Sequence, residues 1–414
     1  MINPIFAPIW QQLGFQAPTA IQKAVYHPLK TDASVLGIAP TGSGKTLAYT
    51  LPLLEKLMPR AGLQLLILVP TQELAVQERT AIQPFTKAVE LKIQAIVGGA
   101  NIRRQIERLK QKPEVIVATP GRLLELIDRR KVKMHTLQTI VIDEADQLLT
   151  ADSRETIRDV VRRAPGETQL GFFSATKIPI LDELPKWFAV PVTTYDVRQQ
   201  DTSAGAVQHL FVASPIRKRV DILRKASHLA DFYALVFFNT AAELEKVAQV
   251  LQHQHVKVAV LDGSLRQTER EQALKALREK QIKLLLSTDV AGRGLDITDL
   301  PAVVNYDLPV DLTTYVHRAG RTGRMGAAGL VLTLGNERQF RDLKQLVREH
   351  YQVKRAYLVA GQITTQKPVQ HEKTSQYNQS TAKNKRISQQ MPAKRQSRKK
   401  KRQRNQLNKG KHRK

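Results

Sequence analysis

The chain has 414 residues, 42% of them apolar and none of them cysteine, which allows two or three packed domains and excludes disulfide frameworks and thiolate metal sites. Its formal net charge is 65 − 37 = +28. No apolar stretch approaches the roughly 18 residues of a membrane span, and no Lys or Arg precedes Lys23 as in a secretory signal, so we expect a cytoplasmic protein without a membrane partner.

A phosphate-binding loop is predicted after the first strand-like run, Val35 to Ile38. The eight residues that follow this run are Ala39, Pro40, Thr41, Gly42, Ser43, Gly44, Lys45 and Thr46. Glycines and free amides at a strand-to-helix turn can wrap phosphates, and Lys45 adds positive charge. Taken alone, this pattern also occurs in unrelated loops.

Apolar strand candidates alternate with helical patterns along two similar halves, which predicts two doubly wound parallel sheets, an α/β fold. In the first half the candidates are Val35–Ile38, Leu65–Val69, Ile93–Val97, Val115–Ala118, Ile140–Ile142 and Leu170–Phe173. In the second half they are Gln208–Val212, Ala234–Phe238, Val256–Leu261, Lys283–Ser287, Ala302–Asn305 and Gly329–Leu334. We therefore predict domains at 1–197 and 207–360, joined by a polar linker at 198–206.

The predicted strand at 140–142 leads directly into two adjacent carboxylates, Asp143 and Glu144. One carboxylate can hold a hydrated Mg²⁺ and the other can orient a water, so this strand end and the phosphate loop together indicate a nucleotide hydrolase. The alternative for the pair alone is a solvated strand end or a helix cap.

An arginine-rich segment, His317 to Arg324, lies in the second half, which has no phosphate loop of its own. Arginines there could meet a γ-phosphate held by the first half, which predicts an interdomain ATP site.

Residues 361–414 carry 17 Lys or Arg and one acid, Glu372, and contain four Leu, Ile, Val or Phe residues. Too few apolar groups remain to form a core, so we predict a disordered basic tail that binds nucleic acid through counterion release. A solubilising tail and an anionic membrane surface are the alternatives.

The motifs in order resemble those of the DEAD-box RNA helicases of superfamily 2. The resemblance runs from Phe6 to Leu334 and includes Gly14-Phe15 with Gln22, the phosphate loop, Pro70 to Ala75, Gly98-Gly99, Thr119 to Arg122, Asp143 to Asp146, Ser174 to Thr176, Val236 to Thr240, Gln267 with Arg270, Ser287 to Asp296 and His317 to Arg324. It implies two RecA-like domains and an RNA-stimulated ATPase that uses ATP and Mg²⁺.

The resemblance assigns catalysis to Lys45, Asp143, Glu144, Arg321 and Arg324. It assigns Mg²⁺ to Thr46 and Asp143, and nucleotide contacts to Phe15, Gln22, Asp296 and the phosphate loop from Ala39 to Thr46. Coupling between the halves falls to Asp146, Ser174, Thr176, Asp289 and His317. An amide such as Gln22 can pair with a donor and an acceptor on adenine, which predicts a preference for ATP over GTP.

RNA contacts are implied for residues that offer backbone amides or positive charge to phosphates. They are Pro70, Thr71, Gly98, Gly99, Thr119, Gly121, Arg122, Gly263, Arg270, Thr288 and Gly294. A helix predicted from Leu123 to Arg130 would bend the bound strand, as the resemblance implies. Gln72 departs from the family, which usually has arginine there.

We expect a monomer that opens short RNA duplexes locally or remodels RNA–protein complexes, with ribosomal or messenger RNA as substrates and RNA-processing proteins as partners of the tail. Two alternatives stay open: an RNA clamp or scaffold with little turnover, and a processive DNA helicase of the same superfamily.

Overall fold

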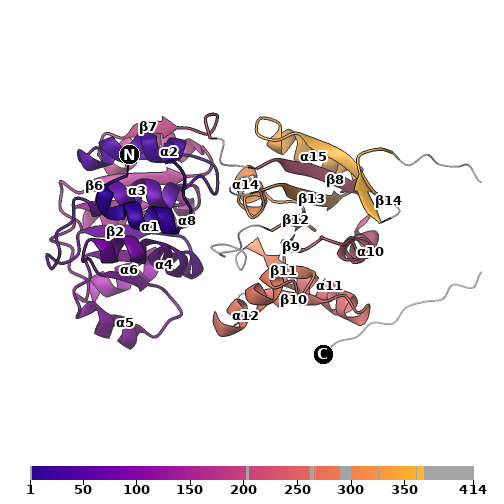
Figure 1. Ribbon diagram of the computed structural model, residues 1–414, viewed down its shortest axis with the longest axis horizontal. Helices are drawn as coiled ribbons and strands as arrows, with labels where there is room; N and C mark the ends of the chain where they lie inside the picture. Colours follow the sequence, from indigo (N-terminus) through magenta and orange to yellow (C-terminus); the bar gives the residue numbers. More distant parts are fainter. Residues whose placement is uncertain are drawn as a thin grey trace, which may run out of the picture. The chain divides into compact units, whose positions relative to one another are not determined.

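The computed structural model describes residues 2–201, 205–261, 265, 267–289, 300–323, 327–359 and 361–367. Residues 2–367 belong to one compact unit that contains two sheets (Figure 1). The sheet within residues 35–196 and the helices that cover it form lobe 1, and the sheet within residues 207–364 and its helices form lobe 2. No helix within these ranges is long and apolar enough to span a membrane.

Lobe 1 is built on a seven-stranded parallel sheet. Its strands are β1 (Val35–Ile38), β2 (Leu65–Leu68), β3 (Ile93–Ile96), β4 (Val115–Ala118), β5 (Thr139–Ile142), β6 (Gln169–Ser174) and β7 (Thr193–Asp196). They lie in the order β3-β4-β2-β5-β6-β1-β7. All four residues of β1, β2, β4 and β5 are buried, as expected for parallel strands covered on both faces.

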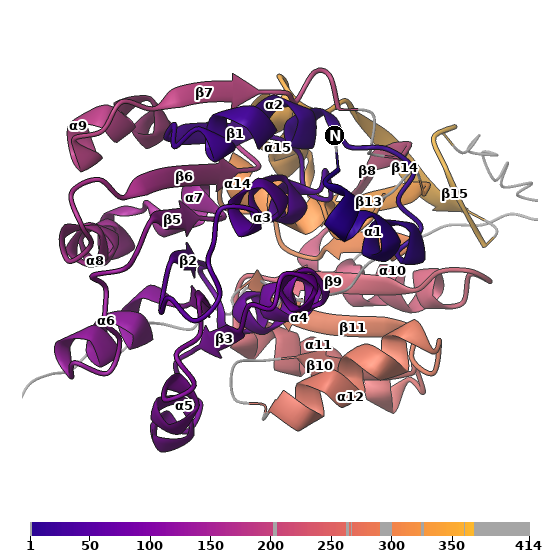
Figure 2. The same cartoon turned by 60° about the vertical axis from the view of Figure 1, so that its left-hand side comes forward.

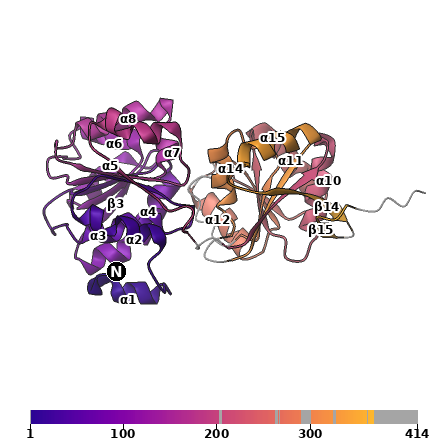
Figure 3. The same cartoon turned by 90° about the horizontal axis from the view of Figure 1, so that it is seen from above.

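Helices cover both faces of the lobe 1 sheet (Figure 3). They are η1 (Pro4–Phe6), α1 (Ala7–Gln12), α2 (Ala20–Lys30), α3 (Lys45–Leu54), α4 (Gln72–Ala88), α5 (Ile102–Leu109), α6 (Pro120–Asp128), α7 (Ala145–Leu148), α8 (Ala151–Arg162), η2 (Pro179–Glu183) and α9 (Leu184–Phe188). Two apolar cores result, one under α2, α3 and α4 and the other under α6, α7 and α8. Side chains alternate between them along each strand, with Val35 in the first core and Leu36 in the second.

Lobe 2 repeats the plan with eight strands. They are β8 (Val207–Ala213), β9 (Ala234–Phe238), β10 (Val258–Leu261), β11 (Leu284–Thr288), β12 (Ala302–Asn305), β13 (Gly329–Gly335), β14 (Val353–Val359) and β15 (Gln362–Thr364). Its described helices are α10 (Ile216–Ser227), α11 (Ala241–His253), α12 (Gln267–Arg278), α14 (Leu312–Ala319) and α15 (Glu337–Val347).

Strand order in lobe 2 is β10-β11-β9-β12-β13-β8-β14-β15. Counted from β8 as its first strand, the leading seven positions have the same order as lobe 1. The predicted fold class, two doubly wound parallel sheets in tandem, is confirmed.

Predicted strands agree with the structure to within one residue at most ends, but three strands were missed and the tail boundary is wrong. The missed strands are β7, β14 and β15. β15 pairs antiparallel with β14 through Leu358 and Ile363, so residues 362–364 form a strand where the sequence predicts disorder from 361 onward. The rest of the predicted tail, 368–414, lies outside the described residues.

Candidate nucleotide and RNA site

The phosphate loop turns sharply between β1 and α3 because two of its glycines adopt left-handed backbone conformations. Gly42 and Gly44 both have φ of 84°, and Gly44 immediately precedes the first residue of α3, Lys45. A Cβ built on Gly44 would lie 2.6 Å from Nε2 of Gln22. The left-handed backbone favours glycine here, and a Cβ would also push the side chain of Gln22 away from the loop. The N-terminal amides of α3 that follow this turn can bind a phosphate.

Gln22 contacts the loop directly. Its Nε2 donates to the carbonyl of Gly44 at 3.2 Å, and its Oε1 accepts from the amide of Thr19 at 3.0 Å. The same Thr19–Gln22 pair forms the capping box of α2. The structure thus joins α2 to the phosphate loop through Gln22; reading of adenine by this residue stays a prediction. Phe15 packs against Trp10, with ring centroids 4.9 Å apart.

Lys45 is folded back onto its own loop. Its ammonium group donates to the carbonyls of Ala39 at 2.8 Å and Pro40 at 2.9 Å. The Ser43 hydroxyl is fully buried and has no hydrogen-bond partner in the described part of the chain. A bound phosphate chain would offer Lys45 stronger, charged acceptors than these carbonyls.

The carboxylates of the second motif stand at the end of β5. Asp143 is 4% exposed, and its Oδ2 accepts from the Tyr49 hydroxyl of α3 at 3.1 Å. Glu144 has φ of 49°, a left-handed conformation that a residue with a Cβ rarely adopts. Burial raises the pKa of Glu144, although His317 and Arg321 act in the opposite direction. A carboxylate with a raised pKa suits a general base near neutral pH.

The donor set at this point fits Mg²⁺, which prefers oxygen ligands and keeps several waters. Asp143 supplies a buried carboxylate, which accepts a hydrogen bond from Tyr49. The Thr46 hydroxyl lies close enough to the same tyrosine to lower its pKa, against the larger effect of burial. No group of three or more His, Cys, Asp or Glu that could hold a metal occurs among the described residues. A metal here would therefore depend on Asp143, Thr46, nucleotide phosphates and water.

Asp146 joins the second motif to residues far away in the sequence. Its Oδ2 accepts from Thr176 Oγ1 at 2.5 Å, and it lies 3.1 Å from Nε2 of His317 on α14 of lobe 2. Ser174 supports the same corner by donating from Oγ to the Thr176 carbonyl at 2.6 Å.

This pairing shifts the titration of both partners. Burial alone would raise the pKa of Asp146, but His317 and the Thr176 hydroxyl hold it at about 2. Burial alone would lower the pKa of His317, but Asp146 raises it. Four of the five predicted coupling residues are therefore accounted for in one polar network.

The fifth predicted coupling residue, Asp289, is held inside lobe 2. Its two carboxylate oxygens accept from Nε and Nη2 of Arg318, each at 2.6 Å. Arg318 is 1% exposed and also donates to the carbonyl of Asp307 and to Asn305 and Asn239. Within the described residues, Asp289 positions Arg318 rather than reaching lobe 1 with a hydrogen bond.

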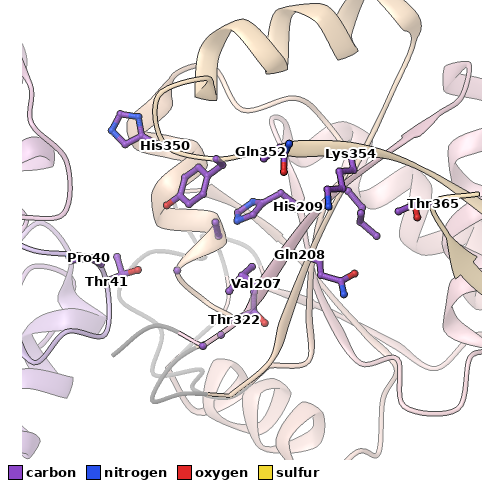
Figure 4. A pocket seen from close by; sticks show the side chains of 16 residues that line it. Pro40, Thr41, Val207, Gln208, His209, Thr322, His350, Gln352, Lys354 and Thr365 are labelled. Atoms are coloured by element: carbon purple, nitrogen blue, oxygen red, sulfur yellow. The ribbon is translucent and has the colours of Figure 1, made fainter. Parts of the chain in front are cut away.

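Two cavities lie beside these residues. One of about 430 Å³ is lined by residues that include Asp146, Gln147, His317, Arg318 and Arg321. The other, about 610 Å³, has Pro40 and Thr41 of the phosphate loop on one side. His209, Thr322 and Lys354 of lobe 2 line it on the other (Figure 4). Both volumes are in the range of small-ligand sites.

The predicted RNA-contacting residues of lobe 1 gather at the carboxyl ends of the neighbouring strands β2, β4 and β3. Thr71 caps α4 by accepting from the Leu74 amide at 3.2 Å, and Thr119 precedes α6. The amide of Gly98 donates to Thr119 Oγ1 at 3.4 Å. Arg122 donates to the carbonyl of Ala100 at 3.1 Å.

Pro70 and Gly121 complete this set by position: Pro70 precedes the cap of α4, and Gly121 lies in the first turn of α6. The helix expected from Leu123 to Arg130 is α6 and begins earlier, at Pro120. Gln72 lies against the glycine pair, because a Cβ on Gly99 would meet its Oε1 at 3.1 Å.

On the lobe 2 side, Thr288 ends β11, and Arg270 of α12 forms an ion pair with Glu73 of α4. The remaining predicted residues Arg324, Asp296, Gly263 and Gly294 lie outside the described residues.

Four residues of the site were missed: Tyr49, Glu78, Gln147 and Arg318. Glu78 of α4 is 2% exposed, and neither carboxylate oxygen has a geometric hydrogen-bond partner in the described part of the chain. Burial and the negative charge of Asp143 raise the pKa of Glu78 well above its ordinary value. One signal could have found it, since Glu78 interrupts the buried stripe formed by Ala75, Ile82 and Phe85.

Comparison with known proteins agrees with this geometry. Residues 19–184 match the family model described as DEAD/DEAH box helicase, and residues 218–326 match the helicase conserved C-terminal domain. The DEAD-box ATP-dependent RNA helicase CshC of Bacillus cereus is 37% identical over 349 residues, 84% of this chain and 90% of the relative. The chain belongs to the DEAD-box helicase family.

Further similarities extend over both lobes. The probable ATP-dependent RNA helicase YfmL of Bacillus subtilis is 38% identical over 341 residues, which cover 82% of this chain and 90% of that protein. A solved structure of Saccharomyces cerevisiae Dbp5 bound to RNA and ADP BeF3 superposes with a TM-score of 0.77 at 28% identity, covering 86% of this chain and 93% of that one. As a DEAD-box family member, the chain is an ATP-dependent enzyme of the helicase class.

Proposed function

We propose that this protein is an ATP-dependent RNA helicase that opens short RNA duplexes locally and without sequence preference, or remodels RNA–protein complexes. The observation that carries the proposal is the Asp146 carboxylate, which joins the second motif to Thr176 and to His317 of lobe 2. Such a link lets nucleotide chemistry in lobe 1 bias the position of lobe 2. The relatives whose names state RNA helicase activity support the choice of substrate.

In this proposal, lobe 1 binds the nucleotide. Lys45 leaves the carbonyls of Ala39 and Pro40 to contact the β- and γ-phosphates, while amides at the start of α3 surround them. Thr46 and Asp143 would hold Mg²⁺, whose charge would neutralise that of the phosphates. Glu144 accepts a proton from the attacking water.

Lobe 2 supplies the cationic groups of the same reaction. Arg321 is 7% exposed, and its charge lowers the pKa of Glu144 against the larger effect of burial, which supports a role for Arg321 next to the proposed general base. Arg321 and Arg324 stabilise charge that develops on the γ-phosphoryl group. Their arrival with lobe 2 makes hydrolysis depend on the arrangement of the two lobes.

RNA binds along the strand ends of lobe 1 and on lobe 2, mainly through its backbone. Pro70, Thr71, Gly98, Gly99, Thr119, Gly121 and Arg122 contact it from lobe 1, and Gly263, Arg270, Thr288 and Gly294 contact it from lobe 2. If RNA and ATP both prefer the same closed arrangement, each strengthens binding of the other, which explains stimulation of the ATPase by RNA.

Other parts of the proposal rest on the sequence. They are contact of Phe15, Gln22 and Asp296 with the nucleoside, recruitment of RNA or RNA-processing proteins by residues 361–414, a monomeric state and a cytoplasmic location. The family match and the names of the relatives both favour RNA over the DNA alternative.

Two assays test the proposal, ATP hydrolysis and strand displacement. Steady-state ATP hydrolysis with and without RNA should show stimulation in the parent and about 10²- to 10⁴-fold lower turnover in Glu144→Gln. Lys45→Ala should show no measurable turnover, because it loses nucleotide binding. Strand displacement over a series of duplex lengths should succeed for short RNA duplexes and fail for long ones. Hydrolysis that RNA does not stimulate would favour the clamp, and efficient opening of long DNA duplexes would favour the translocating helicase.

A further inference from the structure

Helix α5 carries a concentration of positive charge that the proposed reaction does not use. Residues 101–112 contain five Lys or Arg and one acid, Glu107, which gives 5 − 1 = +4. Arg103, Arg104 and Arg108 are exposed. Glu107 is paired with Lys110 at 2.8 Å. In the described part of the chain, none of the three arginine side chains forms an ion pair or a hydrogen bond.

The helix is firmly anchored, so its outward face has a fixed position. Gln105, 6% exposed, donates from Nε2 to the Val97 carbonyl at 2.9 Å and accepts from the Val97 amide at 3.1 Å. Gln94 donates to the carbonyl of Gln105 at 3.0 Å. Ile102, Ile106 and Leu109 pack against the core on the same side. By helical periodicity, Arg104 and Arg108 lie on the opposite side.

The location of α5 is equally specific. It follows the Gly98-Gly99 pair after two residues, Ala100 and Asn101, and Asn101 caps the helix by accepting from the Arg104 amide at 3.2 Å. Arg122 donates to Ala100 and so joins this loop to the start of α6. The preceding strand β3 is the edge of the sheet, and Figure 2 shows α5 beyond it. The basic face therefore continues outward from the proposed RNA contacts of lobe 1.

Arg104 and Arg108 stand four residues apart, about 5 to 6 Å between their Cβ atoms. Like charges at this spacing destabilise a helix. A helix that keeps such a pair without a carboxylate partner is suited to an external anion with repeated charges. The basic tail of the same chain cannot supply it, because residues 361–414 have 17 cationic side chains and one acid.

We infer that Arg104 and Arg108, assisted by Arg103, bind phosphates of the RNA. They contact the part of the RNA that extends past Gly98 and Gly99, beyond the carboxyl ends of the lobe 1 β-strands. This inference rests on the proposed function, because it extends the same RNA footprint. The arginines increase the affinity for RNA beyond the other proposed contacts of lobe 1, and they do so without sequence specificity. An acidic protein surface is the competing partner for this helix face.

The test is RNA binding by the full-length chain, parent and Arg104→Ala/Arg108→Ala, in the presence of a non-hydrolysable ATP analogue. The shortest single strand that stimulates hydrolysis in the parent is determined first. That strand is then extended at its 5′ end or its 3′ end, and affinity is measured over a series of salt concentrations. The salt slope is the steepness with which the logarithm of the binding constant falls against the logarithm of the salt concentration. Each lost phosphate contact should reduce this slope by about 0.7, so the slope of the double variant should be about 1.4 smaller than that of the parent.

We expect this loss for one of the two extended strands and no change for the shortest strand. Turnover at saturating RNA should stay at the parent value, because neither arginine lies at the nucleotide. Arg104→Lys/Arg108→Lys should keep most of the slope. Arg217→Ala/Lys218→Ala, which removes the same charge from exposed positions of α10, should change neither strand's slope.

Equal slopes for parent and double variant on every RNA, with RNA-stimulated hydrolysis intact, would overturn the role of α5 and leave the helicase proposal standing. The acidic-protein alternative predicts that same result. A parent chain that binds no RNA and shows no stimulation would instead remove the proposed function. A Gln105→Ala variant that loses the slope while keeping both arginines would support the need for an anchored helix.

Discussion

The side-chain amide of Gln147 donates to Oε2 of Glu144 at 2.6 Å, which ties the proposed general base to the residue three positions later. The same amide nitrogen contacts Nδ1 of His317 in lobe 2. With its nitrogen facing the ring, Gln147 favours the tautomer with the proton on Nε2, toward Asp146; protonation of Nδ1 would require the amide to turn its oxygen to the ring. Gln147 thus orients the Glu144 carboxylate, and its own orientation depends on which ring nitrogen of His317 carries the proton.

Gln147→Ala should lower the turnover number for ATP about tenfold and leave the KM for ATP little changed. One hydrogen bond to a charged group stabilises by roughly 1.5 kcal/mol, and its loss leaves Glu144 free to turn away from the attacking water. Steady-state kinetics with saturating RNA measures both constants. Gln147→Glu should be worse, because a second carboxylate would repel Glu144. Unchanged turnover in both variants would contradict the positioning role.

Gly44→Ala should abolish nucleotide binding while the chain still folds. The left-handed backbone at φ of 84° strains any residue with a Cβ, and that Cβ would displace Nε2 of Gln22 from the Gly44 carbonyl. The turn therefore shifts, and its amides no longer point at the phosphates. Equilibrium titration with a fluorescent ATP analogue measures the effect. Gly166→Ala is the matched control, because a Cβ added at Gly166 would meet no atom within 4 Å. Normal affinity in Gly44→Ala would show that the loop relaxes freely.

His209 should make the stability of the chain fall in mild acid. Burial lowers its pKa from 6.5 to about 4, and its Nδ1 lies 2.7 Å from the Tyr315 hydroxyl. Between these values the unfolded chain binds a proton that the folded one does not, so the free energy of unfolding decreases as the pH falls from 6.5 to 4, by up to about 3 kcal/mol.

Scanning calorimetry across that pH range, on the parent and on His209→Gln, measures this contribution. The glutamine keeps a hydrogen bond to Tyr315 and cannot titrate, so the variant's Tm should fall less steeply toward pH 4. The carboxylates contribute equally to both chains and cancel in the comparison. Parallel Tm curves would mean that His209 accepts a proton without unfolding.

Glu78→Gln should stabilise the chain increasingly as the pH rises. The raised pKa of Glu78 means that the folded chain retains a proton that the unfolded chain releases above the ordinary value of 4.5. Stability from this group is therefore complete in acid and lost as the pH rises, whereas glutamine is neutral throughout. The Tm difference between variant and parent should grow from pH 4.5 to 8. A constant difference would show that Glu78 ionises normally.

Sequence was sufficient for the sheets because their central strands are short, fully buried apolar runs bounded by helical patterns. Leu65–Leu68 and Val115–Ala118 are of this kind. The missed strand β7 is mostly exposed, and β14 mixes buried Val353 and Ala356 with exposed Lys354 and Arg355. Such strands are fixed by pairing with a neighbour, which composition does not reveal.

The site divides in a similar way. Lys45, Asp143 and Glu144 belong to local patterns whose spacing carries their chemistry. Tyr49 contacts Asp143 across 94 positions, so no local pattern contains that pair. The sequence motif identifies Asp289. Its pairing with Arg318 depends on how α14 packs, which only the fold determines.

The pairing of β14 with β15 affects where the chain can be shortened. A protein cut after residue 360 would leave the outer side of β14 without its neighbour from Tyr357 to Val359. Bare strand edges recruit other chains, so such a fragment should self-associate on concentration. Truncations meant to remove only the basic extension should keep every residue through Lys367.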